Sequence, residues 1–205
     1  MRTRFARPIF AAFVAALVAG AALPAAPTTP AAFKLAPWPQ AAHTPGFTLR
    51  DADGAMRTLR DYRGKIVVVF FGFLRCPGIC SAEMHKLTVV MKQLGERASR
   101  VQVLFITLDP QHDSPKLLKA YMGAFDPRFV GLTGTTAQLN QATSSFQVQY
   151  AHVPQGKDYT IAHSTATLII DAAGRLRLVS AADTPVADLA HDLGILLDEM
   201  RSRSQ

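Results

Sequence analysis

The chain has 205 residues, of which 49% are hydrophobic and 18% charged, so its length suits one globular domain with a tail. Two cysteines are too few for a disulfide-dense scaffold or for a structural zinc site with four thiolates. The net charge of +7 comes partly from three arginines within residues 1–7, and the other basic residues form no long run. Composition therefore predicts no nucleic-acid partner.

Residues 1–23 form a predicted targeting segment. Three arginines precede an uncharged apolar stretch from Ile9 to Leu23, which is the pattern of a basic n-region followed by an h-region. Two interpretations stay open, a cleaved export signal and a retained membrane anchor, and the stretch is shorter than the ~20 residues that span a bilayer. Both predict an extracytoplasmic, periplasmic location, and the second adds a tether to the inner membrane.

Residues 24–45 are rich in proline, alanine and threonine, and this composition excludes a helix or a central strand. They predict a semi-extended linker, so we expect the folded domain to span residues 46–205 and to start near Gly46.

Residues 46–205 carry the pattern of one α/β domain. Alternating residues over 46–49 and 56–59, with Asp53-Gly54 between them, predict an N-terminal β-hairpin. Residues 66–72 (IVVVFFG) form a continuous apolar run, which predicts a strand buried on both faces. The next elements are predicted as helix, strand, helix, helix, β-hairpin and helix, over residues 83–98, 101–108, 113–124, 135–146, 165–179 and 184–200. This order predicts a mixed sheet flanked by helices.

Cys76 and Cys80 follow the buried strand with the spacing C-x3-C. On a helix, positions i and i+4 share one face, with Cβ atoms ~5–6 Å apart, so both sulfurs could serve one site. Pro77 suits a first helical turn, which would leave Cys76 near the N-cap, where the helix dipole favours thiolate. Two neighbouring thiolates are soft donors of the kind that select Cu(I). A structural disulfide and a pair of inert buried thiols remain the alternatives.

Four ordered stretches of the chain form a recognisable set of motifs. The first runs from Gly64 through the apolar strand into the segment CPGIC at residues 76–80. The others are residues 106–115 (ITLDP through DSP), residues 125–134 (FDPRFVGLTG) and residues 159–171, which include His163-Ser164. Together they resemble the Sco/SenC family of copper chaperones, and the similarity covers about residues 45–200.

The resemblance implies a thioredoxin-like fold and one copper ion, Cu(I) or Cu(II), bound through Cys76, Cys80 and His163. It also implies an outward-facing domain, usually tethered to a membrane, that serves assembly of the dinuclear copper site of cytochrome c oxidase. The implied partners are a copper-accepting protein, such as a cytochrome c oxidase subunit, and a protein that reduces the thiols.

The chain departs from the family pattern at three positions near the cysteines. It has Arg75, Gly78 and Ser81 where the family has histidine, an acid and proline. A cationic Arg75 beside Cys76 is expected to repel a copper ion somewhat and to stabilise free thiolates.

The residues support a metallochaperone that turns over no substrate, with an enzyme as the alternative. That alternative is a thiol-disulfide oxidoreductase using Cys76 and Cys80 as its redox pair, with the more exposed Cys76 as nucleophile. Against it, residues 162–170 contain no proline, whereas thioredoxin-like oxidoreductases carry a cis-proline before such a strand. A copper or redox sensor is a third hypothesis. Other polar and sulfur side chains near the motif are predicted to pack in the core, form turns or cap helices, namely Met84, Asp109 and Asp113.

Overall fold

The computed structural model describes residues 32–39 and 44–202. The predicted signal or anchor at residues 1–23 lies outside these residues, as does most of the predicted linker. Within the two described ranges, no helix combines the length and apolar character that a membrane crossing requires.

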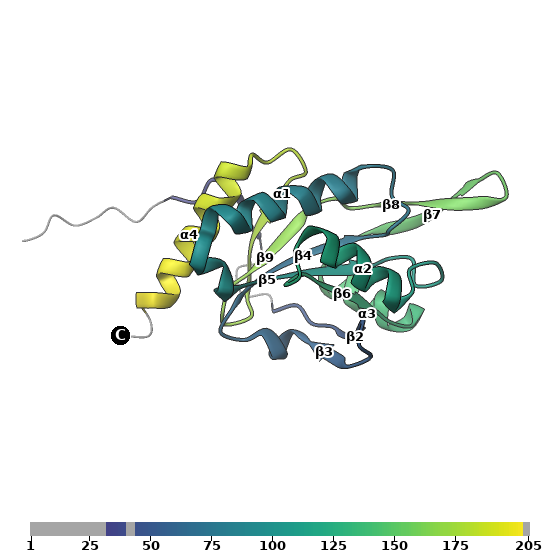
Figure 1. The fold of residues 1–205 in the computed structure, drawn as a ribbon, viewed down its shortest axis with the longest axis horizontal. Helices are drawn as coiled ribbons and strands as arrows, with labels where there is room; N and C mark the ends of the chain where they lie inside the picture. The colour runs from purple at the N-terminus through teal and green to yellow at the C-terminus, as the bar shows by residue number, and fades with distance from the viewer. Residues whose placement is uncertain (1–31, 40–43, 203–205) are drawn as a thin grey trace, which may run out of the picture. The chain divides into compact units, whose positions relative to one another are not determined.

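An eight-stranded mixed sheet forms the centre of the domain, in the order β1-β10-β9-β4-β5-β6-β2-β3 (Figure 1). The central strands β4 (Ile66–Gly72) and β5 (Val101–Thr107) are parallel and buried along their whole length. Their continuous apolar sequence suits a strand covered on both faces, because alternate side chains enter opposite layers of the core. The remaining strands of this sheet are β1 (Ala36–Pro37), β2 (Thr48–Asp51), β3 (Met56–Thr58), β6 (Val130–Thr133), β9 (Thr167–Ile170) and β10 (Leu176–Ser180).

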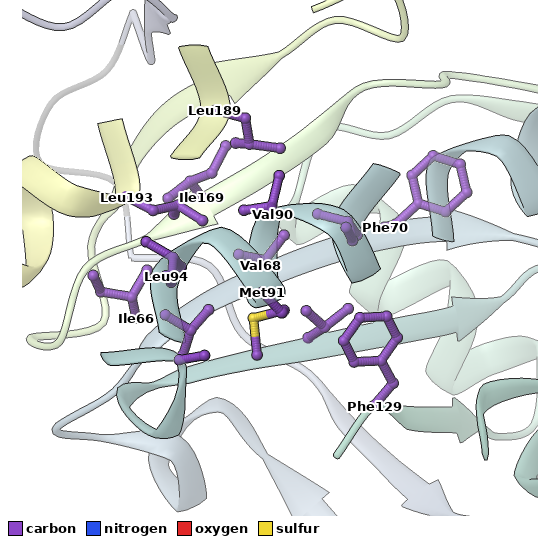
Figure 2. Packing of buried hydrophobic residues seen from close by; sticks show 14 of the residues in the cluster. Ile66, Val68, Phe70, Val90, Met91, Leu94, Phe129, Ile169, Leu189 and Leu193 are labelled. Atoms are coloured by element: carbon purple, nitrogen blue, oxygen red, sulfur yellow. The ribbon is translucent and has the colours of Figure 1, made fainter. Parts of the chain in front are cut away.

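Helices cover both faces of the sheet, as the α/β prediction required. On one face, α1 (Ile79–Leu94), α2 (Pro115–Phe125) and α4 (Val186–Ser202) bury apolar residues against alternate residues of β4 and β5. Figure 2 shows this layer, with side chains of β4 packed against those of α1 and α4. On the other face, α3 (Thr136–Ser145) and β2 pack on the intervening residues. Short 3₁₀ helices cover Leu59–Tyr62 and Gly95–Arg100.

A second sheet of two strands, β7 (Tyr150–Gln155) and β8 (Asp158–His163), stands apart from the first. Figure 1 shows it as a ribbon that projects from the main sheet. The sequence analysis predicted no strand between residues 146 and 165. Because β7 is almost entirely exposed, it carries none of the buried apolar pattern that identified the other strands.

Residues 32–39 lie within the predicted linker, yet they pack on the domain. Ala36 and Pro37 form β1 at the edge of the sheet next to β10, where a proline is tolerated. The Leu35 side chain is buried, and the buried carboxylate of Asp192 on α4 accepts the backbone N–H groups of Lys34 and Leu35 at 2.7–2.9 Å. Packing against the body therefore begins before Gly46.

Candidate metal centre

Cys76, Cys80 and His163 lie together, with ligand atoms all within 4.8 Å of one another. Cys80 is buried, whereas Cys76 and His163 are half-buried, so the group opens to solvent on one side. Both cysteines are free thiols. Over residues 32–39 and 44–202, no other three His, Cys, Asp or Glu side chains gather this closely.

The two cysteines come from the junction between β4 and α1. The Cys76 N–H donates to the Phe73 carbonyl at 3.2 Å, and the Gly78 N–H donates to the Cys76 carbonyl at 2.8 Å, so a tight turn precedes the helix. Gly78 is the N-cap of α1 and has φ of 109°, which glycine adopts without steric cost. The helix therefore begins at Ile79, later than the expected start beside Cys76, and only Cys80 lies in its first turn.

The Cys80 sulfur packs directly against the backbone of β4. A Cβ atom added to Gly72, the last residue of that strand, would lie 2.8 Å from the Cys80 sulfur and 2.9 Å from the Phe70 ring. Real Cβ atoms do not come this close to other heavy atoms, so the position of the sulfur depends on the missing side chain at Gly72. This contact explains why Cys80 is fully buried.

Burial raises the pKa of the Cys80 thiol well above its usual value, and a hydrogen bond with Cys76 raises it further. The negative charges of a Cys76 thiolate and of Asp113 act in the same direction. The helix N-terminus was expected to favour thiolate at Cys76; at Cys80, in the first turn of α1, desolvation dominates instead. Without a bound cation, Cys80 keeps its proton.

His163 is the last residue of β8, and its ring is fixed by its neighbours. The Nδ1 atom lies 2.8 Å from the Ser164 carbonyl, which can only accept, so Nδ1 carries the proton and donates it. The lone pair of Nε2 is then available to a metal ion. The ring packs edge-on against Phe70 and Phe73, with centroids 6.2 and 6.0 Å away.

Arg75, the residue before Cys76, turns its guanidinium to two carboxylates. It donates to Asp158 on β8 at 2.6 Å and to Asp109, in the turn after β5, at 3.2 Å. The Tyr159 hydroxyl also donates to Asp109, at 2.7 Å, and His112 lies 2.9 Å from the same carboxylate. We call these five residues the Arg75 latch. Sequence analysis gave Asp109 only a turn or capping role, because nothing local indicates contacts with Arg75 and β8.

Burial alone would raise the pKa of Asp109, but hydrogen bonds from His112, Tyr159 and Arg75 hold it below its usual value. The hydrogen bond from Arg75 likewise lowers the pKa of Asp158. The positive charge expected to act on copper and the thiolates is thus shared with two carboxylates that are ionised at neutral pH.

Asp113 holds the loop that precedes Cys76 through hydrogen bonds. One oxygen of its buried carboxyl accepts the Leu74 N–H at 3.0 Å and the Thr107 hydroxyl at 2.6 Å. Burial raises the pKa of Asp113, and its other oxygen has no hydrogen-bond partner. The cap of α2 is Ser114 instead, whose hydroxyl accepts from the Leu117 N–H.

The remaining side chains weighed near the motif take no part in the group. Met84 is fully buried in the core cluster, as predicted. His85 packs edge-on against Phe125, with ring centroids 5.0 Å apart.

A family model described as SCO1/SenC matches residues 36–198 of the chain. Among curated relatives, the chain is 40% identical over 132 residues to the mitochondrial SCO2 homolog of Homo sapiens, covering 62% of this chain and 50% of that protein. It is 36% identical over 132 residues to the SCO2-like protein of Rickettsia felis, covering 63% of this chain and 64% of that one. The matched region thus spans less than two thirds of either relative.

Two solved structures are similar along most of their length. The first is copper-bound ScoI of Bradyrhizobium japonicum, with 30% identity and a TM-score of 0.69 over 75% of this chain and 98% of that one. The second is yeast Sco1 with copper bound, with 31% identity and a TM-score of 0.64 over 75% and 89%. These likenesses confirm the predicted thioredoxin-like fold.

Proposed function

The chain belongs to the SCO1/SenC family, and we propose that it is a metallochaperone whose cargo is one copper ion held by Cys76, Cys80 and His163. The observation that carries the proposal is the meeting of the three ligand atoms within 4.8 Å, although His163 comes from a separate sheet far along the chain. The description of the Bradyrhizobium and yeast relatives as copper-bound supports the choice of metal.

The donor chemistry fits copper. Two thiolates are soft ligands and favour Cu(I), and an added imidazole suits Cu(II) as well. Nε2 of His163 is free to bind because Nδ1–H is engaged by the Ser164 carbonyl. The half-buried Cys76 and His163 form the open side, so an ion meets them before it meets the buried Cys80.

Protons and electrons both control this site. The raised pKa of Cys80 means that this thiol must release its proton when copper binds, so the protein's affinity for copper rises with pH. The free sulfurs must also stay reduced, because a disulfide between Cys76 and Cys80 would remove both donors. A protein that reduces this pair is therefore a proposed partner.

We infer the destination of the copper from the resemblance of the four motifs. The proposed acceptor is a copper-binding subunit of cytochrome c oxidase, during assembly of its copper site. The basic and apolar pattern of residues 1–23 supports a periplasmic location, with or without a tether to the inner membrane.

A thiol-disulfide oxidoreductase is the second candidate, and one feature favours it. The pair joins a half-buried sulfur, Cys76, to a fully buried one, Cys80, which suits a nucleophile and its resolving partner. Such an enzyme would reduce the cysteines of a copper protein and would need no imidazole from His163.

An anaerobic Cu(I) titration of the reduced full chain tests the proposal. We expect about one copper per chain, abolished by Cys76→Ser or Cys80→Ser and weakened by His163→Ala. His85→Ala is the matched control, because His85 lies on α1 but packs against Phe125 and does not belong to the three-residue group. Stoichiometry well below one, or unchanged affinity in His163→Ala, would contradict the site. Reduction of insulin at a rate comparable to thioredoxin, without copper retention, would favour the enzyme.

A further inference from the structure

The Arg75 latch joins the two parts of the chain that carry the proposed copper donors. Arg75 precedes Cys76 directly in the loop after β4. Its guanidinium reaches Asp158, the first residue of β8, and the last residue of the same strand is His163. One side chain thus connects the cysteine loop to the strand that brings the imidazole.

The strand β8 depends on such contacts for its position. Among the described residues it pairs only with β7, and a lone two-stranded hairpin is marginally stable in water. Tyr159, Ile161 and His163 alternate along β8 and therefore share one face. Ile161 is buried in the core, His163 lies beside the sulfurs, and the Tyr159 hydroxyl donates to Asp109. This face therefore contacts the body through three side chains. Tyr159, which belongs to the latch, is the one nearest the turn of the hairpin.

Asp109 is the fixed point of the latch. Its carboxylate is fully buried in the turn after β5, one of the two parallel central strands of the sheet. It accepts hydrogen bonds from Arg75 and Tyr159, and His112 lies within hydrogen-bond distance. Charge-assisted hydrogen bonds to a buried carboxylate are stronger than those between neutral groups. The guanidinium also lies over the Tyr159 ring, 5.5 Å from its centroid. Loop and hairpin are therefore held to a rigid part of the fold.

We propose that Arg75 is a positioning residue, which acts through the latch to keep His163 seated against Cys76 and Cys80. The inference rests on the proposed function and deepens it by naming what holds the third donor in place. When the latch is broken, β8 spends less time seated, and the apparent affinity for copper falls in proportion to the seated fraction.

A different explanation for any effect of Arg75 must be separated from this one. A positive charge next to Cys76 also stabilises thiolates, and its removal alone would weaken copper binding. Asp158 distinguishes the two, because it belongs to the latch but carries the opposite charge and lies on the hairpin. Replacing it weakens the direct link between Arg75 and β8 and leaves the positive charge of Arg75 in place.

The first experiment measures Cu(I) affinity by competition with a chelator, using the reduced full chain. Arg75→Gln and Asp158→Asn are each expected to weaken binding ~3–10-fold, and the double variant no more than Arg75→Gln alone. In a His163→Ala background, Asp158→Asn should not change the affinity further. Lys157→Gln, an exposed residue beside Asp158 in the same hairpin, is the matched control and should bind like the parent.

The second experiment needs no metal. Amide hydrogen exchange of the reduced, copper-free chain should show lost protection along β8 in Arg75→Gln and Asp158→Asn, with β9 unchanged. Unchanged protection of β8 would overturn the proposal, as would a loss of copper affinity in Asp158→Asn that persists in the His163→Ala background. If the parent chain binds no copper, the proposed function fails, while the exchange measurement still decides whether the latch holds β8.

Discussion

Two β-hairpins that adjoin in the sequence differ in almost every physical respect. β9–β10 belongs to the eight-stranded sheet, where β9 is buried throughout and pairs with both β4 and β10. β7–β8 ends at His163, four residues before β9 begins, and in the part of the chain that the structure describes its strands pair only with each other. The first hairpin is held by the hydrophobic core, whereas the second is held by a few side-chain contacts with the body. His163, the proposed third donor, comes from the second hairpin.

The carboxylates in the two turns show the same contrast. Asp171, in the turn after β9, accepts the backbone N–H groups of Ala173 and Arg175 and the Arg175 guanidinium, so it closes its own turn. Asp158, at the turn of β7–β8, reaches instead to Arg75 on another loop. One carboxylate therefore closes its own turn, whereas the other ties its hairpin to the loop before the cysteines.

We expect the largest effect, a loss of global stability, from a substitution in the buried hairpin β9–β10. Ile169→Ala on β9 removes a fully buried side chain and should lower the free energy of unfolding by about 2–5 kcal/mol. The matched substitution Val153→Ala on β7 removes a side chain that is 41% exposed and should cost less than about 0.5 kcal/mol. Urea denaturation of the reduced chain measures both. Equal losses of unfolding free energy in the two variants would contradict the contrast between the two hairpins.

A smaller effect is expected at the turn of β9–β10, and it depends on pH. Asp171→Asn should cost about 1–2 kcal/mol at pH 7, because charge-assisted hydrogen bonds are lost. Burial alone would raise the pKa of Asp171, but hydrogen bonds from Arg175 hold it below its usual value. Its contribution is therefore present above the unfolded pKa of ~3.9 and is lost as the pH falls through the folded value.

Denaturation curves at neutral and acid pH check this sign. The gap between the parent chain and Asp171→Asn should narrow below about pH 4, because the parent carboxylate becomes protonated there. Asp158→Asn serves as the contrast and should leave the melting temperature unchanged at both pH values. A gap that widens in acid would contradict the assignment for Asp171.

The smallest expected effect is local to β8. The Tyr159→Phe variant loses one hydrogen bond to Asp109, while Asp109 keeps Arg75 and His112. Amide exchange along β8 should become about 2–5-fold faster, which corresponds to about 0.5–1 kcal/mol of local stability. Global unfolding should not change measurably. If exchange in β9 accelerated as well, the two hairpins would not be independent units.

What the sequence predicted follows the same division. Residues 66–72 were predicted as a buried strand and form β4 with those bounds, because a continuous apolar run leaves little ambiguity. The hairpin β7–β8 was missed, because exposed strands carry little pattern. The start of α1 differs from the prediction, because the turn before the helix depends on the positive φ of Gly78, which the spacing of residues does not reveal.

The candidate site, too, could be predicted from the sequence only in part. The C-x3-C spacing alone indicated a pair of sulfurs, but His163 was chosen through the family resemblance, since nothing local brings it to the cysteines. The contact between Arg75 and Asp158 is not encoded by any local pattern. It exists only because the loop after β4 and the strand β8 meet in the folded chain.

The hydrogen bonds from the Lys34 and Leu35 N–H groups to Asp192 have a mechanical consequence. A force applied to the chain from its N-terminal side would act on these bonds and on the two-residue strand β1 before it acted on any central strand. Once they peeled away, the point of attachment would move across the sheet from the β10 edge toward the β2 edge. Residues 34–39 would then be able to extend to roughly 20 Å.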